Sequence, residues 1–287
     1  TLAAYSKTGT IHVLSVSGMH VGIIYLVLNV LLAFLNRGQL MKLARALFII
    51  LVIWCYAAIT GFSPSVLRSA LMLTCFIIAK TLNRRSNDYN ILAFSAFVLL
   101  IDDPLLIYDL GFQLSYSAVW GLIYLQPLIY HKFSIDPWIG DKLWKYISFS
   151  LAAQLATFPL SVYYFHQFPV YFLISNLVVM LPAALIMYLG FAILLLKLNF
   201  LAPILEYLIA FTNAMLKWIA QLPYATLSSI YLNKTELCLL VLFLGLSICC
   251  MQKLTKTRLA LTLVALLCLQ TATAVNKIKS YQRSHKS

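Results

Sequence analysis

Charged residues are scarce in this sequence, and acidic residues are the scarcest of them. Only 10% of the 287 residues are charged, and eight acidic residues stand against 21 lysines and arginines. Soluble domains carry about 25% charged residues, so this composition excludes an ordinary soluble protein. The rest is apolar, because 62% of the residues are hydrophobic. They form repeated runs near the ~20 residues that cross a bilayer.

Sequence motifs of metal binding, nucleotide hydrolysis and export are also missing. No CxxC pair, zinc-spaced Cys/His cluster, GxxxxGK(S/T) loop or early secretory signal occurs. The cysteines lie inside apolar runs, where they act as small packing residues: Cys55, Cys75, Cys238, Cys249, Cys250 and Cys268. We therefore expect no disulfide, no metal, no cofactor and no enzymatic activity, and any energy for transport must come from a partner.

The apolar runs predict an all-α fold, a polytopic transmembrane helical bundle. About ten hydrophobic elements are joined by short connections, without a soluble insert or an internal repeat. They lie near 11–35, 45–61, 64–82, 90–101, 111–130, 146–165, 169–197, 203–222, 236–252 and 258–276. In this interpretation residues 1–287 form one domain, and the opening TLAAYSKTGT reads as the interior of a longer protein.

Two segments depart from simple spanning helices. The element at 90–101 is too short to cross at ~1.5 Å per residue, and it runs into DDPLLIYDLGF. This pattern predicts a broken or re-entrant helix, since irregular backbone in a membrane must be buried in protein or line water. In HKFSIDPWIGDKLWKY, Asp136 and Pro137 are typical of a helix start. Tryptophans beside lysines favour a helix lying in the inner interface there.

Basic residues gather in alternate connections, after the first, third, fifth, seventh and ninth elements. Because positive loops remain cytoplasmic, both ends of the chain are predicted on the outer side. The basic tail after residue 276 breaks this pattern. The formal net charge of +13 also suits a polyanionic partner such as nucleic acid, and charge alone does not choose between the two interpretations.

The stretch GFSPSVLRSA, residues 61–70, contains the elements of an anion site. Gly61 permits a sharp turn, and Ser63 followed by Pro64 predicts a helix start with free N–H groups. Arg68 stands one turn in, which completes a candidate site for phosphate. The alternative is that Arg68 extends to the outer interface, because a charge at the bilayer centre costs at least ~2.5–3.5 kcal/mol.

The stretch HVLSVSGMHVG carries a second group of candidates. Ser15, Ser17 and His20 are candidate residues of an anion path, and Ser17 and His20 share one helix face. Gly18 and Gly22 form a GxxxG pattern, which either lets a second helix approach closely or marks a helix break beside a cavity. His20 would donate to an anion or cap a buried hydroxyl.

The stretch DLGFQLSYSAVWG and the residues before it hold the third group. Gln113 and Tyr116 share a helix face, where they either join helices or line a hydrated path. Asp103 and Asp109 are candidates for gating or charge tuning. A hypothesis is that Asp109 pairs with Arg68 and sets its effective charge.

A fourth stretch, residues 152–182, contains amides and prolines within apolar sequence. Gln154, Pro159, Asn176 and Pro182 predict local helix breaks whose backbone groups are satisfied by neighbouring helices.

An intramembrane hydrolase is a disfavoured alternative. Ser15 or Ser17 with a histidine would supply a nucleophile and a base. However, the glycine pattern of a nucleophile elbow is missing. His131 and His166 also fall near connections on opposite sides of the membrane in the predicted topology.

Four ordered blocks, TGTIHVLSVSGMHVG, GFSPSVLRSALM, DPLLIYDLGFQLSYSAV and QLATFPL…NLVVMLP, resemble the ComEC competence-protein family. The resemblance covers most of residues 8–186 and fades towards the C-terminus. The matching positions are Ser17, Gly18, His20, Gly22, Gly61, Ser63, Pro64, Arg68, Asp103, Pro104, Asp109, Gly111, Gln113, Ser115, Gln154, Pro159, Asn176 and Pro182. Val16, Met19 and Leu110 are mild departures from the family pattern.

The resemblance implies an inner-membrane channel of bacteria that takes up single-stranded transforming DNA during natural competence. It also implies flanking OB-like and metallo-β-lactamase-like domains, and this sequence shows neither. Implied partners are DNA, membrane lipids, an external DNA receptor, and a cytoplasmic DNA motor or single-strand-binding proteins. A homodimer sharing one conduit is an open possibility.

Two other functions would fit the same residues. A secondary transporter for a small anion also uses broken helices and helix starts aimed at its substrate, although such folds commonly show related halves and none is found here. A membrane scaffold that docks soluble partners would tolerate alanine at His20 and Arg68.

Overall fold

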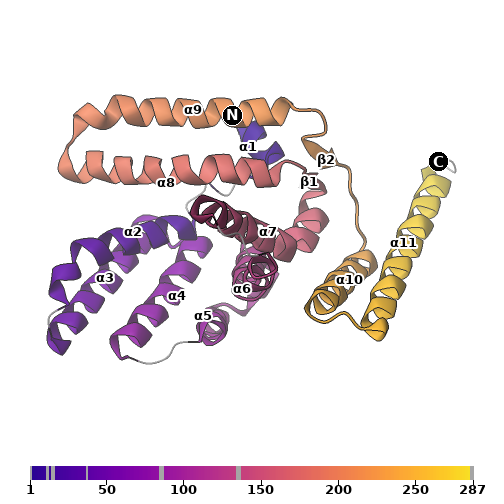
Figure 1. Ribbon diagram of the computed structural model, residues 1–287, viewed down its shortest axis with the longest axis horizontal. Coiled ribbons are helices and arrows are strands. Elements are labelled where there is room, and N and C mark those ends of the chain that lie inside the picture. Colours follow the sequence, from indigo (N-terminus) through magenta and orange to yellow (C-terminus); the bar gives the residue numbers. More distant parts are fainter. Residues whose placement is uncertain are drawn as a thin grey trace. The chain divides into compact units, whose positions relative to one another are not determined.

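The computed structural model describes residues 2–10, 13, 17–36, 38–83, 87–133 and 137–284, and this part of the chain is almost entirely helical (Figure 1). Its α-helices are α1 (Leu2–Lys7), α2 (Gly18–Leu31), α3 (Gln39–Ile59), α4 (Pro64–Thr81), α5 (Asp88–Asp102), α6 (Leu110–Tyr130), α7 (Trp138–Phe165), α8 (Phe172–Leu196), α9 (Ala202–Gln221), α10 (Lys234–Gln252) and α11 (Lys256–Ser284). The 3₁₀ helices are η2 (Ala33–Leu35), η3 (Pro104–Tyr108) and η4 (Asn199–Leu201). Two short paired strands, β1 (Gln167–Pro169) and β2 (Thr226–Ser228), complete the elements. The predicted all-α fold is confirmed.

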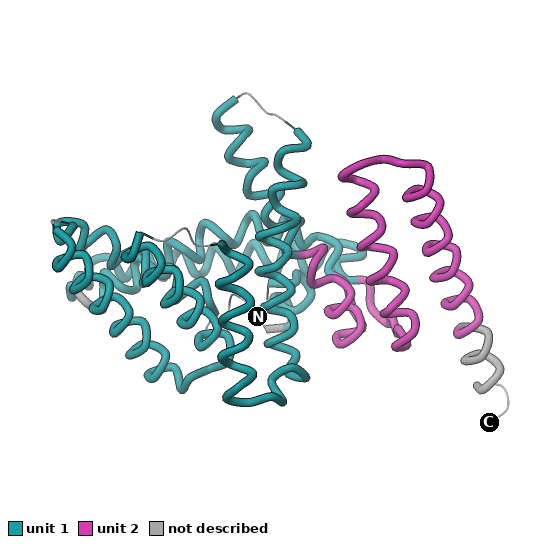
Figure 2. Tube along the Cα trace, turned by 90° about the horizontal axis from the view of Figure 1, so that it is seen from below, with its two compact units in different colours: residues 1–153, 169–226 teal, residues 154–168, 227–287 magenta. Residues whose placement is uncertain are grey.

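The chain divides into two compact units, which Figure 2 distinguishes by colour. Unit 1 comprises residues 1–153 and 169–226, and unit 2 comprises residues 154–168 and 227–287. Within unit 1, α8 and α9 run side by side, and α1 packs on α9 (Figure 1). Within unit 2, α10 and α11 form a helical hairpin.

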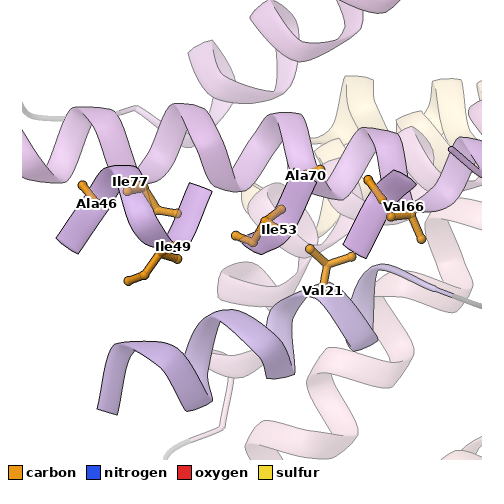
Figure 3. Close-up of a cluster of buried hydrophobic side chains, with 8 residues drawn as sticks. Val21, Ala46, Ile49, Ile53, Val66, Ala70 and Ile77 are labelled. Carbon is orange, nitrogen blue, oxygen red and sulfur yellow. The ribbon is translucent and has the colours of Figure 1, made fainter. Parts of the chain in front are cut away.

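One buried core cluster of unit 1 lies between α2, α3 and α4 (Figure 3). On α3 the buried residues Ala46, Ile49, Ile53 and Ala57 recur every three or four positions. This spacing forms one apolar stripe along a helix. Val21 of α2 points into the same cluster. The small alanines let the backbones of the three helices approach closely, and this packing fixes the positions of α2 and α4 relative to α3.

Among the residues that the structure describes, six helices are long and apolar enough to cross a membrane. They are α3, α4 and the apolar parts of α8, α9, α10 and α11. Their outward side chains are large and apolar, for example Leu40 and Ile59, which are 81% and 84% exposed. Such surfaces are stable against lipid and not against water. The expected run at 11–35 is helical as α2 only over 14 residues, and α5 has 15 residues, so both are short for a bilayer.

The predicted break after α5 is present. The backbone changes from α5 to the 3₁₀ helix η3 and then to α6. Each change begins at an aspartate cap: the Asp103 carboxylate accepts the Leu105 N–H at 2.9 Å, and the Asp109 carboxylate accepts the Phe112 N–H at 2.7 Å. Short polar side chains at these positions satisfy the N–H groups that a new helix leaves free.

The segment expected as an interfacial helix forms the first turns of α7 instead of a separate helix. Asp136 lies outside the described residues, and α7 runs without interruption from Trp138 to Phe165. No glycine or proline lies between residues 141 and 158, so nothing ends the helix there. The interfacial chemistry is nevertheless present, because Lys142 Nζ lies 3.9 Å from the Trp138 ring and Trp144 donates to the Tyr130 carbonyl at 3.0 Å.

Pro159 and Pro182 do not break their helices, in contrast to the sequence-based expectation. Both lie inside continuous helices, α7 and α8 respectively. A proline removes one backbone hydrogen bond, and packing in a helical bundle offsets that loss. Asn176 acts as a packing residue, because its side chain on α8 donates to Ser150 Oγ on α7 at 2.9 Å.

Candidate functional site

The start of α4 forms as the sequence predicts. Gly61 has a positive φ of 67°, which favours glycine, Ser63 is the N-cap and Pro64 is the first helical residue. The Ser63 hydroxyl makes no side-chain cap and is buried without a hydrogen-bond partner in the described part of the chain. The free N–H groups of this helix end therefore have an unpaired hydroxyl beside them.

Arg68 lies one turn into α4 and is almost completely buried, with 3% of its surface exposed. Its side chain is enclosed by protein rather than extended to an interface, which contradicts the alternative raised from the sequence. Its Nε atom has no hydrogen-bond partner among the described residues. A buried guanidinium N–H without an acceptor is unfavourable, so this group is available to an anionic ligand.

Arg68 belongs to a polar cluster that joins three helices, which we call the arginine cluster and define as Arg68, Ser95, Asp109 and Tyr116. The Asp109 carboxylate and the Tyr116 hydroxyl both interact electrostatically with the guanidinium. Around Gly111, an added Cβ would lie 3.1 Å from Asp109 Oδ1 and 3.9 Å from Arg68 Nη2. These distances place the two charged groups on one side of the α6 start.

Asp109 and Arg68 form no direct ion pair among the described residues, so their attraction is weaker than that of charged groups in contact. Asp109 uses one oxygen to cap α6, as noted above. Asp109 therefore weakens the electrostatic field around Arg68 without cancelling it. The charge-tuning role of Asp109 stays a prediction, which the proximity of the two groups makes testable.

Ser95 and Tyr116 complete the cluster from α5 and α6. Ser95 is fully buried, lies 3.1 Å from the Tyr116 hydroxyl and donates to the Leu92 carbonyl at 2.8 Å. The Tyr116 ring packs on Phe112 with ring centroids 4.3 Å apart. Sequence reasoning missed Ser95, whose only signal was one hydroxyl within the apolar run FSAF.

Two other sequence candidates near the cluster have local structural roles. Asp103 is exposed and caps η3. The Gln113 side chain donates to the Ile107 carbonyl of η3 at 2.8 Å. Both residues therefore stabilise the break before α6, and the structure places only Asp109 of the two aspartates beside Arg68.

Ser17 and His20 pair with each other at the start of α2. His20 Nδ1 accepts the Ser17 backbone N–H at 3.2 Å and lies 3.1 Å from Ser17 Oγ. Ser17 is the N-cap and His20 the third helical residue, so the pair forms a capping box. Accepting at Nδ1 leaves the neutral ring with its proton on Nε2, which is the atom that can donate to a ligand. Ser15 lies outside the described residues.

Gly18 provides the close helix contact that the GxxxG pattern suggested, and Gly22 does not. A Cβ on Gly18 would lie 2.2 Å from Ser69 Oγ of α4, whereas a Cβ on Gly22 meets no atom within 4 Å. Ser69 directly follows Arg68, so this contact holds the first and second sequence blocks together. Of the two glycines, only Gly18 therefore lies at the contact with α4.

We expect Gly18→Ala to destabilise the protein by about 1–3 kcal/mol, since the new methyl group would overlap with Ser69. Gly22→Ala is the matched control and should be neutral or stabilising by up to ~1 kcal/mol, because alanine favours a helix. Thermal unfolding in detergent measures both. Adding Ser69→Ala to Gly18→Ala should recover stability, because only a 3.3 Å contact with the residue 69 Cβ remains.

The site therefore consists of hydrogen-bond donors held in apolar surroundings. In the chain outside the gaps described above, no group of three or more His, Cys, Asp or Glu residues is placed to hold a metal. A buried arginine, a free hydroxyl and a helix start can bind a phosphate or another anion.

These features define a class: a helical, membrane-spanning protein with an arginine buried between α4, α5 and α6. The model of the competence protein family matches residues 1–257, and the chain therefore belongs to that family. Family membership and the six apolar helices make it a multi-pass membrane protein.

Two relatives match this chain over part of their own length. It is 32% identical over 169 residues to ComE operon protein 3 of Bacillus subtilis (strain 168), covering 59% of this chain and 20% of the relative. It is 31% identical over 157 residues to an uncharacterized protein of Aquifex aeolicus (strain VF5), covering 54% of this chain and 34% of the relative. The chain thus spans 20% and 34% of the length of these two relatives. No solved structure matches it significantly.

Proposed function

We propose that this protein forms the conduit through which single-stranded DNA crosses the bacterial cytoplasmic membrane during natural competence. Membership of the competence protein family supports a role in DNA uptake. The observation that carries the finer proposal is the burial of Arg68 between apolar helices with its Nε unpaired. A buried charge in a membrane protein is costly and marks an ion or substrate pathway.

The arginine cluster should attract a phosphate group only moderately, as a conduit requires. Each nucleotide brings one phosphate charge, and a site that binds phosphates too tightly would stop transport. Asp109 weakens the field of Arg68, while Ser63 and the start of α4 add neutral donors. The stacked rings of Trp120 and Tyr124, with centroids 5.1 Å apart, add an aromatic surface of the kind on which bases stack.

The remaining parts of the proposal follow from the charge pattern and the family. Both ends of the chain lie on the outer side, an external receptor delivers DNA, and a cytoplasmic motor or single-strand-binding protein supplies the direction. In this proposal, two protomers could together enclose one DNA conduit. We expect no hydrolysis by the Ser17–His20 pair, because His20 Nδ1 already accepts the Ser17 N–H and has no second lone pair with which to activate Ser17 Oγ.

The alternative function is secondary transport of a small anion, since a free guanidinium N–H recognises any phosphate or carboxylate.

Deleting the gene in its transformable host should abolish entry of labelled DNA into the cytoplasm, and restoring the full gene should recover it. Proteoliposomes containing the full protein should not accumulate labelled phosphate. Normal DNA entry in the deletion strain, or phosphate accumulation without DNA binding, would contradict the proposal.

A further inference from the structure

A second polar site lies at the other end of α4, in unit 1 and away from the arginine cluster. It is a cavity of about 370 Å³ between α2, α3 and α4, within the range of about 300–1,000 Å³ that small-molecule sites occupy. Lys80 lines it and stands twelve residues beyond Arg68, which is about 18 Å along the helix. The two sites are therefore separate.

The cavity is cationic. Lys42 and Arg45 of α3 and Lys80 of α4 line it, and none of the described lining residues is acidic. Three positive charges without a carboxylate repel one another, so the site is more stable when an anion occupies it. A phosphate group is the anion that lysine and arginine side chains bind most readily in concert.

Arg45 is held in place at the wall of this cavity. Its Nη1 donates to the Asn36 side chain at 2.6 Å, and its Nη2 donates to the Asn29 side chain at 2.7 Å. Its Nε is buried and has no hydrogen-bond partner among the described residues. Arg45 is thus a preorganised charge with one unsatisfied donor. Lys42 and Lys80 are exposed, and Lys80 Nζ lies 5.8 Å from the centroid of the Phe76 ring.

Exposed apolar side chains flank the lining segments, and we call them the rim. Phe34 precedes the lining residue Asn36, Leu82 stands between the lining residues Thr81 and Asn83, and the two side chains are 67% and 56% exposed. A ligand that satisfies both the cations and this rim has an anionic head and hydrocarbon chains. A nucleic acid strand would leave these large side chains uncovered, so the rim favours a lipid.

We infer that this cavity binds the headgroup phosphate of an anionic phospholipid, with the acyl chains lying against the rim. The predicted topology places the cavity at the cytoplasmic leaflet, where anionic lipids supply negative charge and basic pockets between helices capture headgroups. The bound lipid would bridge α2, α3 and α4 at the end opposite to the arginine cluster. This inference is independent of the proposed transport function.

Native mass spectrometry of the full protein in neutral detergent tests this inference. Wild-type protein should retain phosphatidylglycerol and not phosphatidylcholine. The double variant Lys42→Gln, Lys80→Gln should bind phosphatidylglycerol at least about tenfold more weakly, because two cations near the phosphate are lost. The matched control is Lys145→Gln, Lys217→Gln, which removes two exposed lysines of unit 1 that do not line the cavity and should leave binding unchanged.

Two soluble probes distinguish a lipid from other phosphates. Glycerol phosphate and a single-stranded oligonucleotide should bind more weakly than phosphatidylglycerol, since neither covers the apolar rim. Equal retention of phosphatidylglycerol by wild type and the Lys42, Lys80 variant would overturn the inference. Binding of either soluble probe as tight as that of the lipid would also overturn it.

Discussion

Replacing Arg68 with glutamine should lower transformation by about 10- to 100-fold while the protein remains folded in the membrane. Glutamine keeps part of the volume and two donors but removes the charge. A hydrogen bond to a charged group contributes about 1.5–3 kcal/mol, which corresponds to this range of rates if the bond to phosphate is made during transport. Transformation frequency, normalised to the amount of protein in the membrane, measures the effect.

The conservative variant Arg68→Lys separates charge from geometry. Lysine retains the positive charge but lacks the planar group with several fixed donors, so we expect partial activity. Lys217→Gln, which removes an exposed charge on α9, is the control and should transform normally. Wild-type transformation by Arg68→Gln at normal protein levels would remove Arg68 from the DNA path.

Replacing Asp109 with asparagine should destabilise the protein by about 1–3 kcal/mol. Asparagine still caps α6, so the change isolates the loss of negative charge beside Arg68. A buried charge that loses its compensating partner is strongly unfavourable. The free energy of unfolding, measured by denaturant titration in mixed micelles, gives the effect.

Asp103→Asn is the matched control for Asp109→Asn, because Asp103 caps η3 from an exposed position. We expect its effect to stay within about 0.5 kcal/mol. The double variant Arg68→Gln, Asp109→Asn should be more stable than the sum of the two single changes predicts, by about 0.5–3 kcal/mol. Strict additivity would show that the two side chains are not coupled, and the charge-tuning role of Asp109 would be wrong.

Local sequence was sufficient to predict features whose cause is also local. The start of α4 at Pro64 follows from Gly61 and Ser63, which need no distant partner. The break between α5 and α6 follows in the same way from aspartates that cap the next helix. The apolar runs predicted the helices themselves, since an α-helix satisfies its own backbone in a membrane.

Predictions about breaks and close contacts were less successful, because these depend on neighbouring helices. Pro159 and Pro182 have the same local effect in any helix, but packing on each side keeps α7 and α8 continuous. Gly18 and Gly22 look equivalent in the sequence. Only Gly18 meets Ser69, because the crossing position of α2 and α4 is set by the whole contact.

By itself, the sequence determined that this protein is a helical membrane protein, where α4 and α6 start, and which family it resembles. Only the tertiary structure decided that Arg68 and Asp109 lie close together, that Ser95 joins them through Tyr116, and that Lys42 and Lys80 share a cavity with Arg45. The physical reason is distance along the chain. Helix propensity and capping act within about one turn, whereas these groups meet only after α4 has packed against its neighbours.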